Sequence, residues 1–145
     1  TEEEVVMRLA RVGYDNVHGY LDGGISAWRS SGRPTDSIES ITAPELAARL
    51  AKGPLHIVDV RKDGEWETER VQGAKHASLQ FINDHLDVFS KNGPNYIHCA
   101  GGYRSMVAAS LMKARGFHNV IDVAGGFNAI KNTGIPLTDP VCRMD

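Results

Sequence analysis

The segment H-C-A-G-G-Y-R-S, residues 98–105, combines residue types that can hold a reactive sulfur. Two glycines after Cys99 allow the backbone to curl around an anion. Arg104 adds a cationic fork, and the Ser105 hydroxyl can cap a helix or donate to the sulfur. Helical sequence follows, and the positive end of a helix favours a thiolate over a thiol. The pattern predicts a nucleophilic Cys99 in a cradle formed by Ala100, Gly101, Gly102, Tyr103, Arg104 and Ser105.

Three short apolar runs, at 55–60, 95–99 and 120–123, are typical of strands buried on both faces. Because helical patterns separate them, we expect an α/β fold: an open parallel sheet with helices on both faces. Cys99 would then lie at the carboxyl end of a strand, where such sheets bind ligands. A lone cysteine at a strand end is more commonly a small buried apolar residue, so the interpretation depends on the whole loop.

The helices have their own signals. Thr42-Ala43-Pro44-Glu45 predicts a capping box that opens a helix, and Gly53 ends that helix. A second helix is expected from about Ser105 to Arg115, and a third over residues 80–93.

An internal repeat links the two ends of the chain. Residues 13–34 and 116–136 share G-aromatic-x-N-V, then G-G, an alanine three residues later, and G-x-P. Only the second copy has a complete set of elements before it. We therefore interpret residues 1–34 as the C-terminal remnant of one domain and residues 35–145 as a complete domain of the same kind.

Composition excludes several classes of function. A net charge of -2 with interspersed signs gives no field for binding nucleic acid. No apolar run approaches the roughly 20 residues of a membrane span, so no membrane association is expected. With only Cys99 and Cys142, the chain can build neither a disulfide framework nor a cysteine-rich zinc site, and we expect a cytoplasmic protein with reduced thiols.

Other reactive residue types are not assigned to the site. The six histidines show no metal-ligand spacing, and we expect neither a metal nor another cofactor. His98, in a buried strand beside Cys99, is expected to bind a backbone group rather than act as a base. Cys142 could accept sulfur from Cys99 or form a disulfide with it, but a mobile terminus with an idle thiol is the simpler interpretation.

The chain resembles the rhodanese family of sulfurtransferases. The resemblance rests on C-A-G-G-Y-R-S, on D-V-R at 59–61, on E-W-x-x-x-R-V-x-G-A at 65–74, and on the terminal G-G-F-N-A-I-x-x-x-G-I-P. It implies a rhodanese-like sheet and a sulfurtransferase in which Cys99 accepts a sulfane sulfur as a persulfide and passes it to a thiol, sulfite or cyanide. Asp59 and Arg61 would support the loop and pocket, although Asp59 could equally just end its strand.

Loop length separates two chemistries within this fold. Dual-specificity phosphatases of related fold need one more residue between cysteine and arginine to enclose a phosphate, whereas Cys99 and Arg104 enclose four. A phosphatase is therefore the weaker alternative, and Asp63 and Glu65 are the remaining candidates for its general acid. A non-catalytic docking or regulatory module is a second alternative, against which the retained Cys99 argues.

The resemblance also implies a sulfur donor. Dedicated thiosulfate enzymes resemble C-R-K-G-x-T in the loop and carry an arginine after D-x-R, whereas neutral Ala100 and Gly101, and Glu65, stand here. Because thiosulfate is a dianion, a thiol persulfide is the expected donor. Glu69-Arg70-Val71 replaces the usual G-H-I, and we interpret it as an altered surface turn near the pocket.

The tail at residues 13–34 also resembles the end of a rhodanese unit. The whole chain is similar to the C-terminal part of a bacterial fusion that joins a metallo-β-lactamase-fold persulfide dioxygenase to rhodanese units. Apolar residues in the remnant, such as Val5, Val6, Leu9 and Trp28, lead us to expect a dimer or contact with upstream domains of a larger parent chain.

Overall fold

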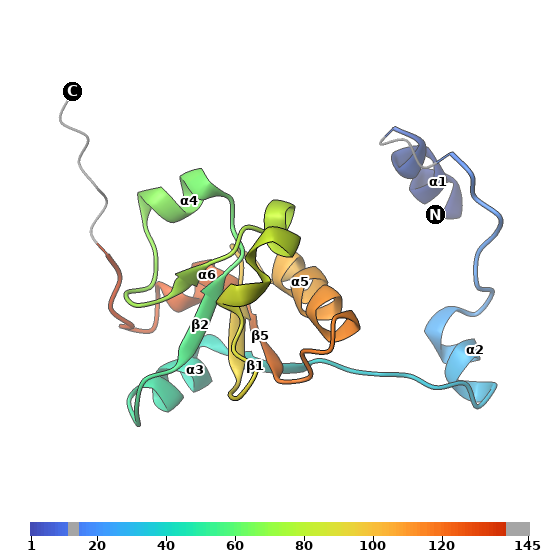
Figure 1. The fold of residues 1–145 in the computed structure, drawn as a ribbon. Coiled ribbons are helices and arrows are strands. Elements are labelled where there is room, and N and C mark those ends of the chain that lie inside the picture. The colour runs from blue at the N-terminus through green and yellow to red at the C-terminus, as the bar shows by residue number, and fades with distance from the viewer. Residues whose placement is uncertain (12–14, 139–145) are drawn as a thin grey trace. The chain divides into compact units, whose positions relative to one another are not determined.

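The computed structural model describes residues 1–11 and 15–138, and it divides the chain into two compact units, Thr1–Ser37 and Ile38–Asp145. The second unit is built on a five-stranded parallel sheet with the strand order β1-β5-β4-β2-β3 (Figure 1). Its strands are β1 (Glu39–Thr42), β2 (His56–Asp59), β3 (Lys75–His76), β4 (Asn95–His98) and β5 (Val120–Ala124). The predicted α/β class and parallel sheet are confirmed.

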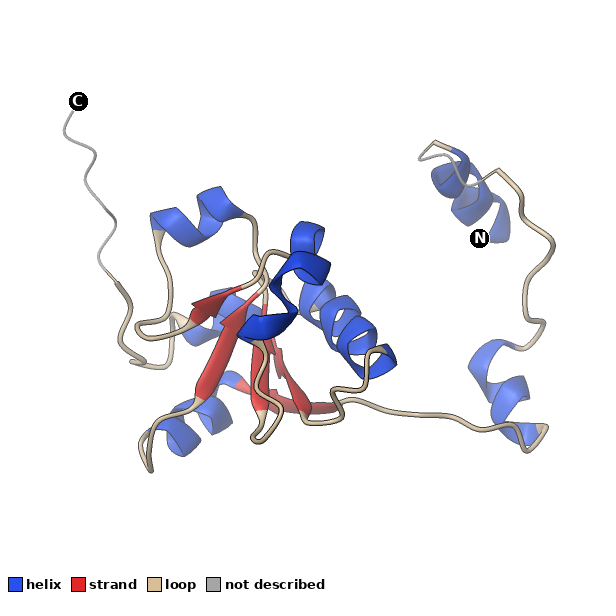
Figure 2. Cartoon of the chain, in the orientation of Figure 1, coloured by secondary structure: helices blue, strands red, loops and turns tan. Residues whose placement is uncertain are grey.

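Helices cover both faces of this sheet (Figure 2). On one face α3 (Ala43–Leu50) and α6 (Gly126–Ile130) pack with Ile57, Tyr96 and Ile121. On the other face α5 (Tyr103–Ala114) and η1 (Leu79–Val88) pack with Val58 and Ile97. Neighbouring strand residues enter opposite clusters, as the pleat requires. The central strands β2, β4 and β5 are thereby buried on both faces.

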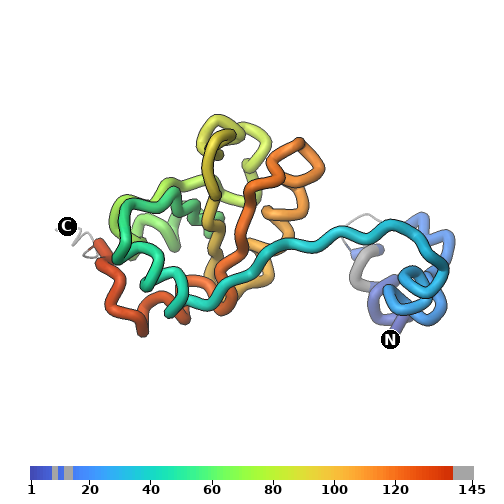
Figure 3. Tube along the Cα trace, turned by 90° about the horizontal axis from the view of Figure 1, so that it is seen from below, coloured from blue at the N-terminus to red at the C-terminus, as the bar shows by residue number. Residues whose placement is uncertain are grey.

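The sequence analysis did not predict two of the strands, because each forms by pairing with a strand that is distant in the sequence. In β1 only Ile41 is buried, and the strand exists through its register with β5, in which Ser40 pairs with Asp122. Figure 3 shows β1 running beside β5, although Ser40 and Asp122 are 82 positions apart in the chain. The second, β3, has two residues and pairs with the end of β2. Helix α4 (Asp63–Thr68) was also not predicted.

The predicted helices differ in accuracy. The capping box at Thr42 and Glu45 is present, and α3 follows it. Helix α5 begins at Tyr103, two residues before the predicted start, because Gly102 in a left-handed conformation precedes it. The helix predicted over 80–93 is confirmed only in part: a 3₁₀ segment, η1, occupies Leu79–Val88, ends five residues early and is kinked at Phe81 and His85. Ile82 is its one fully buried residue, and Leu79, Leu86 and Val88 pack partly buried against the same core cluster.

The first unit contains α1 (Glu2–Ala10) and α2 (Gly24–Ser30). The predicted repeat has a backbone counterpart here. Gly23 and Gly24 at the start of α2 have φ angles of 71° and 58°, and their equivalents at the start of α6, Gly125 and Gly126, have 76° and 54°. The two copies thus build the same left-handed turn before a short helix. None of the helices in the described ranges is both long and apolar enough to cross a membrane.

Candidate active site

Cys99 follows the last residue of the central strand β4, so it lies at the carboxyl ends of the parallel strands. The loop from Cys99 to Gly102 leads directly into α5. Gly102 has a φ of 106°, a left-handed conformation that side-chain-bearing residues rarely adopt. Only 1% of Cys99 is exposed. A substrate must therefore present a small reacting group to reach the sulfur within this loop.

Hydrogen-bond donors converge on the Cys99 sulfur. The Gly102 N–H donates to Sγ at 3.1 Å. Burial raises the pKa of the Cys99 thiol, but the Ser105 hydroxyl, the Ser105 N–H and the N–H groups of Gly102 and Gly101 more than offset this, so the net pKa is lowered. Hydrogen bonds to the charged form have this effect because they stabilise the thiolate. The loop thus favours the nucleophilic state of the sulfur.

Arg104, the only cation of the loop, is bound by Glu65 of α4. Its two terminal nitrogens donate to the two carboxylate oxygens at 2.6 and 2.9 Å, a bidentate pair. The pair lowers the pKa of Glu65 to about 2, against the opposing effect of burial. The Lys62 N–H also donates to this carboxylate at 3.2 Å, which anchors Glu65 at the start of α4. The positive charge of Arg104 is therefore neutralised beside the loop.

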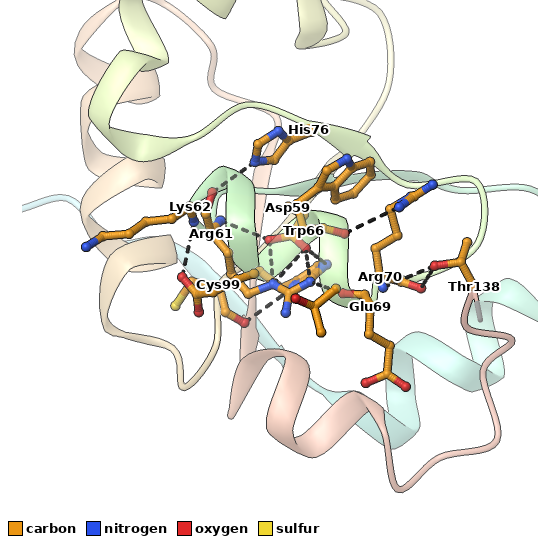
Figure 4. A network of polar contacts seen from close by, with 12 residues as sticks. Asp59, Arg61, Lys62, Trp66, Glu69, Arg70, His76, Cys99 and Thr138 are labelled. Carbon is orange, nitrogen blue, oxygen red and sulfur yellow. Dashed lines mark hydrogen bonds and ion pairs between the residues drawn. The ribbon is translucent and has the colours of Figure 1, made fainter. Parts of the chain in front are cut away.

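Asp59 and Arg61 form a buried ion pair beneath the site. Arg61 Nε lies 3.0 and 2.8 Å from the two Asp59 oxygens, and a terminal nitrogen lies 2.7 Å from Oδ2. The same guanidinium donates to the Glu69 carbonyl at 2.6 Å and lies 3.9 Å from the centre of the Phe127 ring. Figure 4 shows this pair in one network near Cys99. Asp59 therefore does more than end its strand.

Helix α6 holds the carbonyl side of the Cys99 loop. The Phe127 N–H donates to the Cys99 carbonyl at 2.6 Å, and the Asn128 N–H donates to the Ala100 carbonyl at 3.0 Å. These two N–H groups belong to the first turn of α6, where they have no partner within the helix. The loop thus receives hydrogen bonds from an element separate from the one that follows it in the chain.

His98 is fully buried and is unsuited to act as a base. Its Nδ1 lies 3.3 Å from the Cys99 carbonyl, in agreement with the expectation of a backbone partner. Burial lowers the pKa of His98, and Arg61 lowers it further, although Asp59 and the Cys99 carbonyl oppose the change. Nε2 lies 3.9 Å from Asp59 and has no hydrogen-bond partner among the placed residues. The ring is therefore a neutral structural group.

The segment Glu69-Arg70-Val71 is more firmly built in than the predicted surface turn. Val71 is 1% exposed and bridges to Leu137, and Thr138 exchanges hydrogen bonds with the backbone of Arg70. Trp66 contacts both Arg70 and His76, with the His76 ring stacked at 4.8 Å (Figure 4). His76 in turn contacts the Arg61 carbonyl at 2.9 Å. Residues 69–71 and His76 therefore hold Arg61 in place, through the Glu69 carbonyl and the contact of His76 with the Arg61 carbonyl.

The predicted cradle divides into residues with different surroundings. The Gly102 N–H donates to the sulfur, and Gly101 and Ser105 also lower the pKa of Cys99. The Ser105 hydroxyl lies 3.0 Å from the Gly102 carbonyl, Ala100 offers its carbonyl to α6, and Arg104 binds Glu65. Tyr103 is 83% exposed and encloses little of the sulfur.

The sequence interpretation missed three contributions: the partner of Arg104, and the N–H groups of Phe127 and Asn128. The G-G of the repeat was the only signal for the last two. Cys142 lies outside the described residues. Where side chains are placed, no three His, Cys, Asp or Glu residues gather to hold a metal ion.

Comparison with known proteins agrees with this architecture. Residues 42–133 match the family model of the rhodanese-like domain. A thiosulfate sulfurtransferase, GlpE, from Actinobacillus succinogenes is 30% identical over 81 residues, which cover 56% of this chain and 73% of that protein. "Putative sulfur carrier protein YrkF" from Bacillus subtilis is 38% identical over 72 residues, half of this chain, but the match spans only 39% of YrkF.

A solved structure gives the same result. The rhodanese-like domain protein from Staphylococcus aureus is 37% identical, with a TM-score of 0.63 over 68% of this chain and 97% of that one. The shared sheet, the loop after β4 and the matched residues 42–133 show that the chain belongs to the rhodanese-like domain family.

Proposed function

We propose that the protein is a rhodanese-type sulfurtransferase that carries a sulfane sulfur as a persulfide on Cys99. The observation that carries the proposal is the Gly102 N–H that donates to Sγ at 3.1 Å, in a loop whose Gly101, Gly102 and Ser105 groups lower the pKa of Cys99. These donors stabilise a thiolate, and a persulfide anion on the same sulfur would use them in the same way. Relatives named thiosulfate sulfurtransferase support the general activity.

The transfer has two balanced steps. The Cys99 thiolate attacks the outer sulfur of a donor R–S–SH, the donor's S–S bond breaks, and the donor leaves as R–SH. Cys99 then holds the sulfane sulfur as a persulfide anion. A thiophilic acceptor, which can be a thiol, sulfite or cyanide, attacks that outer sulfur, and the Cys99 thiolate leaves. The sulfane sulfur moves without net oxidation or reduction.

We further propose that a thiol persulfide is preferred to thiosulfate as the donor. Thiosulfate must release sulfite, a dianion, and needs cationic groups at the loop. Ala100 and Gly101 are neutral, and the Glu65 carboxylate neutralises Arg104. A thiol persulfide carries less charge on the group that enters the loop, so it suits this neutral environment better.

Two alternatives receive less support. A phosphatase needs its loop arginine to bind the phosphate, and here Arg104 is engaged by Glu65 within a loop one residue short. A non-catalytic docking module would need no activated thiol, yet the pKa of Cys99 is lowered.

We propose small sulfur-containing molecules as substrates and a cytoplasmic location. The two-domain interpretation of residues 1–34 and 35–145, the dimer or upstream contact, and the relationship to a dioxygenase fusion also stay predictions.

Intact-mass spectrometry tests the proposal. The protein is incubated with glutathione persulfide and, separately, with thiosulfate, alongside Cys99→Ser. We expect the wild type to gain one sulfur atom from glutathione persulfide, and cyanide or sulfite to remove it, while Cys99→Ser gains none. Since Cys142 is a second thiol, Cys142→Ser is the matched control and should load like the wild type. A wild type that gains no sulfur from either donor would refute the sulfurtransferase.

A further inference from the structure

The N–H groups that face the Cys99 sulfur depend on how the loop's peptide planes are oriented. In a planar trans peptide the carbonyl of one residue and the N–H of the next point to opposite sides. No cis peptide occurs in the described parts of the chain. Fixing the Ala100 carbonyl therefore fixes the direction of the Gly101 N–H, one of the groups that lower the pKa of Cys99.

The group that fixes this carbonyl belongs to α6. The Asn128 N–H donates to the Ala100 carbonyl at 3.0 Å, and the Phe127 N–H donates to the Cys99 carbonyl at 2.6 Å. Both donors come from the first helical turn, so neither hydrogen bond competes with the helix. The two carbonyls are thereby tied to the start of α6.

Such a close approach requires a glycine at position 126. A Cβ there would lie in contact with the Cys99 carbonyl oxygen and 2.8 Å from the carbonyl carbon and oxygen of Ala100. The equivalent Gly24 in the first unit has nearly the same φ, 58° against 54°, yet no atom lies within 4 Å of its Cβ position among those described. The left-handed turn is common to both copies, whereas the contact with a cysteine loop belongs to the second.

We propose that the Gly125–Gly126 turn and the first turn of α6 position the cradle, so that Gly126 and the backbone N–H of Asn128 determine how well the loop stabilises the Cys99 thiolate. The consequence for sulfur transfer rests on the function proposed above. The effect on the thiolate does not, since it concerns the free thiol alone.

Two matched pairs of variants test this assignment, all in Cys142→Ser protein so that only Cys99 titrates. Gly126→Ala is compared with Gly24→Ala, which introduces the same backbone strain without the contact. Asn128→Pro removes the N–H that binds Ala100 and is compared with Ser26→Pro at the equivalent position of α2. Asn128→Ala retains the N–H. The ultraviolet absorbance of the thiolate is followed against pH, and circular dichroism monitors the fold.

We expect Gly126→Ala and Asn128→Pro to titrate at higher pH than the parent. At a pH below both midpoints the thiolate population should fall about fivefold, the effect of losing one hydrogen bond. Gly24→Ala, Ser26→Pro and Asn128→Ala should titrate like the parent. If Gly126→Ala does not fold, the comparison of Asn128→Pro with Asn128→Ala decides.

An unchanged titration in Asn128→Pro would overturn the proposal, as would an equal shift in Ser26→Pro. Sulfur loading of the parent is measured separately. A parent that loads sulfur while the variants titrate normally would refute only the positioning role. A parent that never loads, with shifted variants, would refute only the sulfurtransferase.

Discussion

Glu65 of α4 binds both terminal nitrogens of Arg104, the only cation in the Cys99 loop, at 2.6 and 2.9 Å. The two side chains are 35% and 30% exposed, so the pair lies at the rim of the site rather than in the core. A rim pair contributes little to stability, because water screens it. Its larger effect is on the charge that an incoming substrate meets.

Glu65→Gln should shift the donor preference toward thiosulfate. The amide keeps the shape of the side chain but no longer neutralises Arg104, which then attracts a dianion. We expect the ratio of thiosulfate to glutathione persulfide loading rates to rise about fivefold, which corresponds to about 1 kcal/mol. Stopped reactions analysed by intact mass give both rates.

The matched control for this change is Glu39→Gln, which disrupts another exposed ion pair, with Arg49, in β1. It should leave the donor ratio unchanged. The same ratio in Glu65→Gln and the wild type would show that Glu65 does not influence the donor.

The Glu65–Arg104 pair should also make stability depend on pH in the acid range. The pKa of Glu65 is lowered from 4.5 to about 2 by Arg104. A carboxyl group with a depressed pKa stabilises the fold above its unfolded pKa, and this contribution is lost as pH falls through the folded pKa. The difference in Tm between wild type and Glu65→Gln should therefore shrink between about pH 4.5 and about pH 2, as measured by thermal unfolding. A constant difference over that window would contradict it.

Ser105→Ala should make Cys99 a weaker acid. Ser105 is fully buried, and its hydroxyl is the strongest of the hydrogen bonds that lower the Cys99 pKa. Without it, burial weighs more heavily, and the thiolate titration should move to higher pH. Alkylation with iodoacetamide in Cys142→Ser protein should then slow severalfold at neutral pH. The control is Ser110→Ala, on the exposed side of the same helix, which should react like the parent. An unchanged alkylation rate in Ser105→Ala would show that the hydroxyl donates only to the Gly102 carbonyl, 3.0 Å away, and does not stabilise the thiolate.

Local signals explain which parts of the fold could be predicted. The capping box at Thr42, the apolar run of β4 and the loop that starts at Cys99 are each recognisable from residues that are close together in the sequence. Strand β1 carries no such signal, because Ile41 is its one buried residue and its pairing partner β5 is distant in sequence.

The same limit applies to the site. Glu65 and Arg104 are 39 positions apart and lie on different elements, so no spacing reveals their pair. The sequence shows Glu65 as a motif residue and a departure from the thiosulfate enzymes, but not as the partner of Arg104. The G-G of the repeat marks positions 125–126 as special, but the Cys99 and Ala100 carbonyls that α6 contacts become visible only in three dimensions.

The buried pair of Asp59 and Arg61 should control stability more strongly than the rim pair does. Asp59 is fully buried and Arg61 is 4% exposed, so removal of one partner leaves the other charged and unpaired in the core. Asp59→Ala should lower the free energy of unfolding by about 3 to 5 kcal/mol, measured by urea denaturation. Because Arg61 also donates to the Glu69 carbonyl and packs on Phe127, Arg61→Met should cost a similar amount. The double variant should lose clearly less than the sum of the two single losses, since it leaves no unpaired charge. The control is Glu39→Gln, in the exposed pair with Arg49, which should change the free energy of unfolding by no more than about 0.5 kcal/mol.

Additive losses for Asp59→Ala and Arg61→Met would contradict the prediction. They would mean that the two residues support the Cys99 loop through separate contacts rather than as one ion pair.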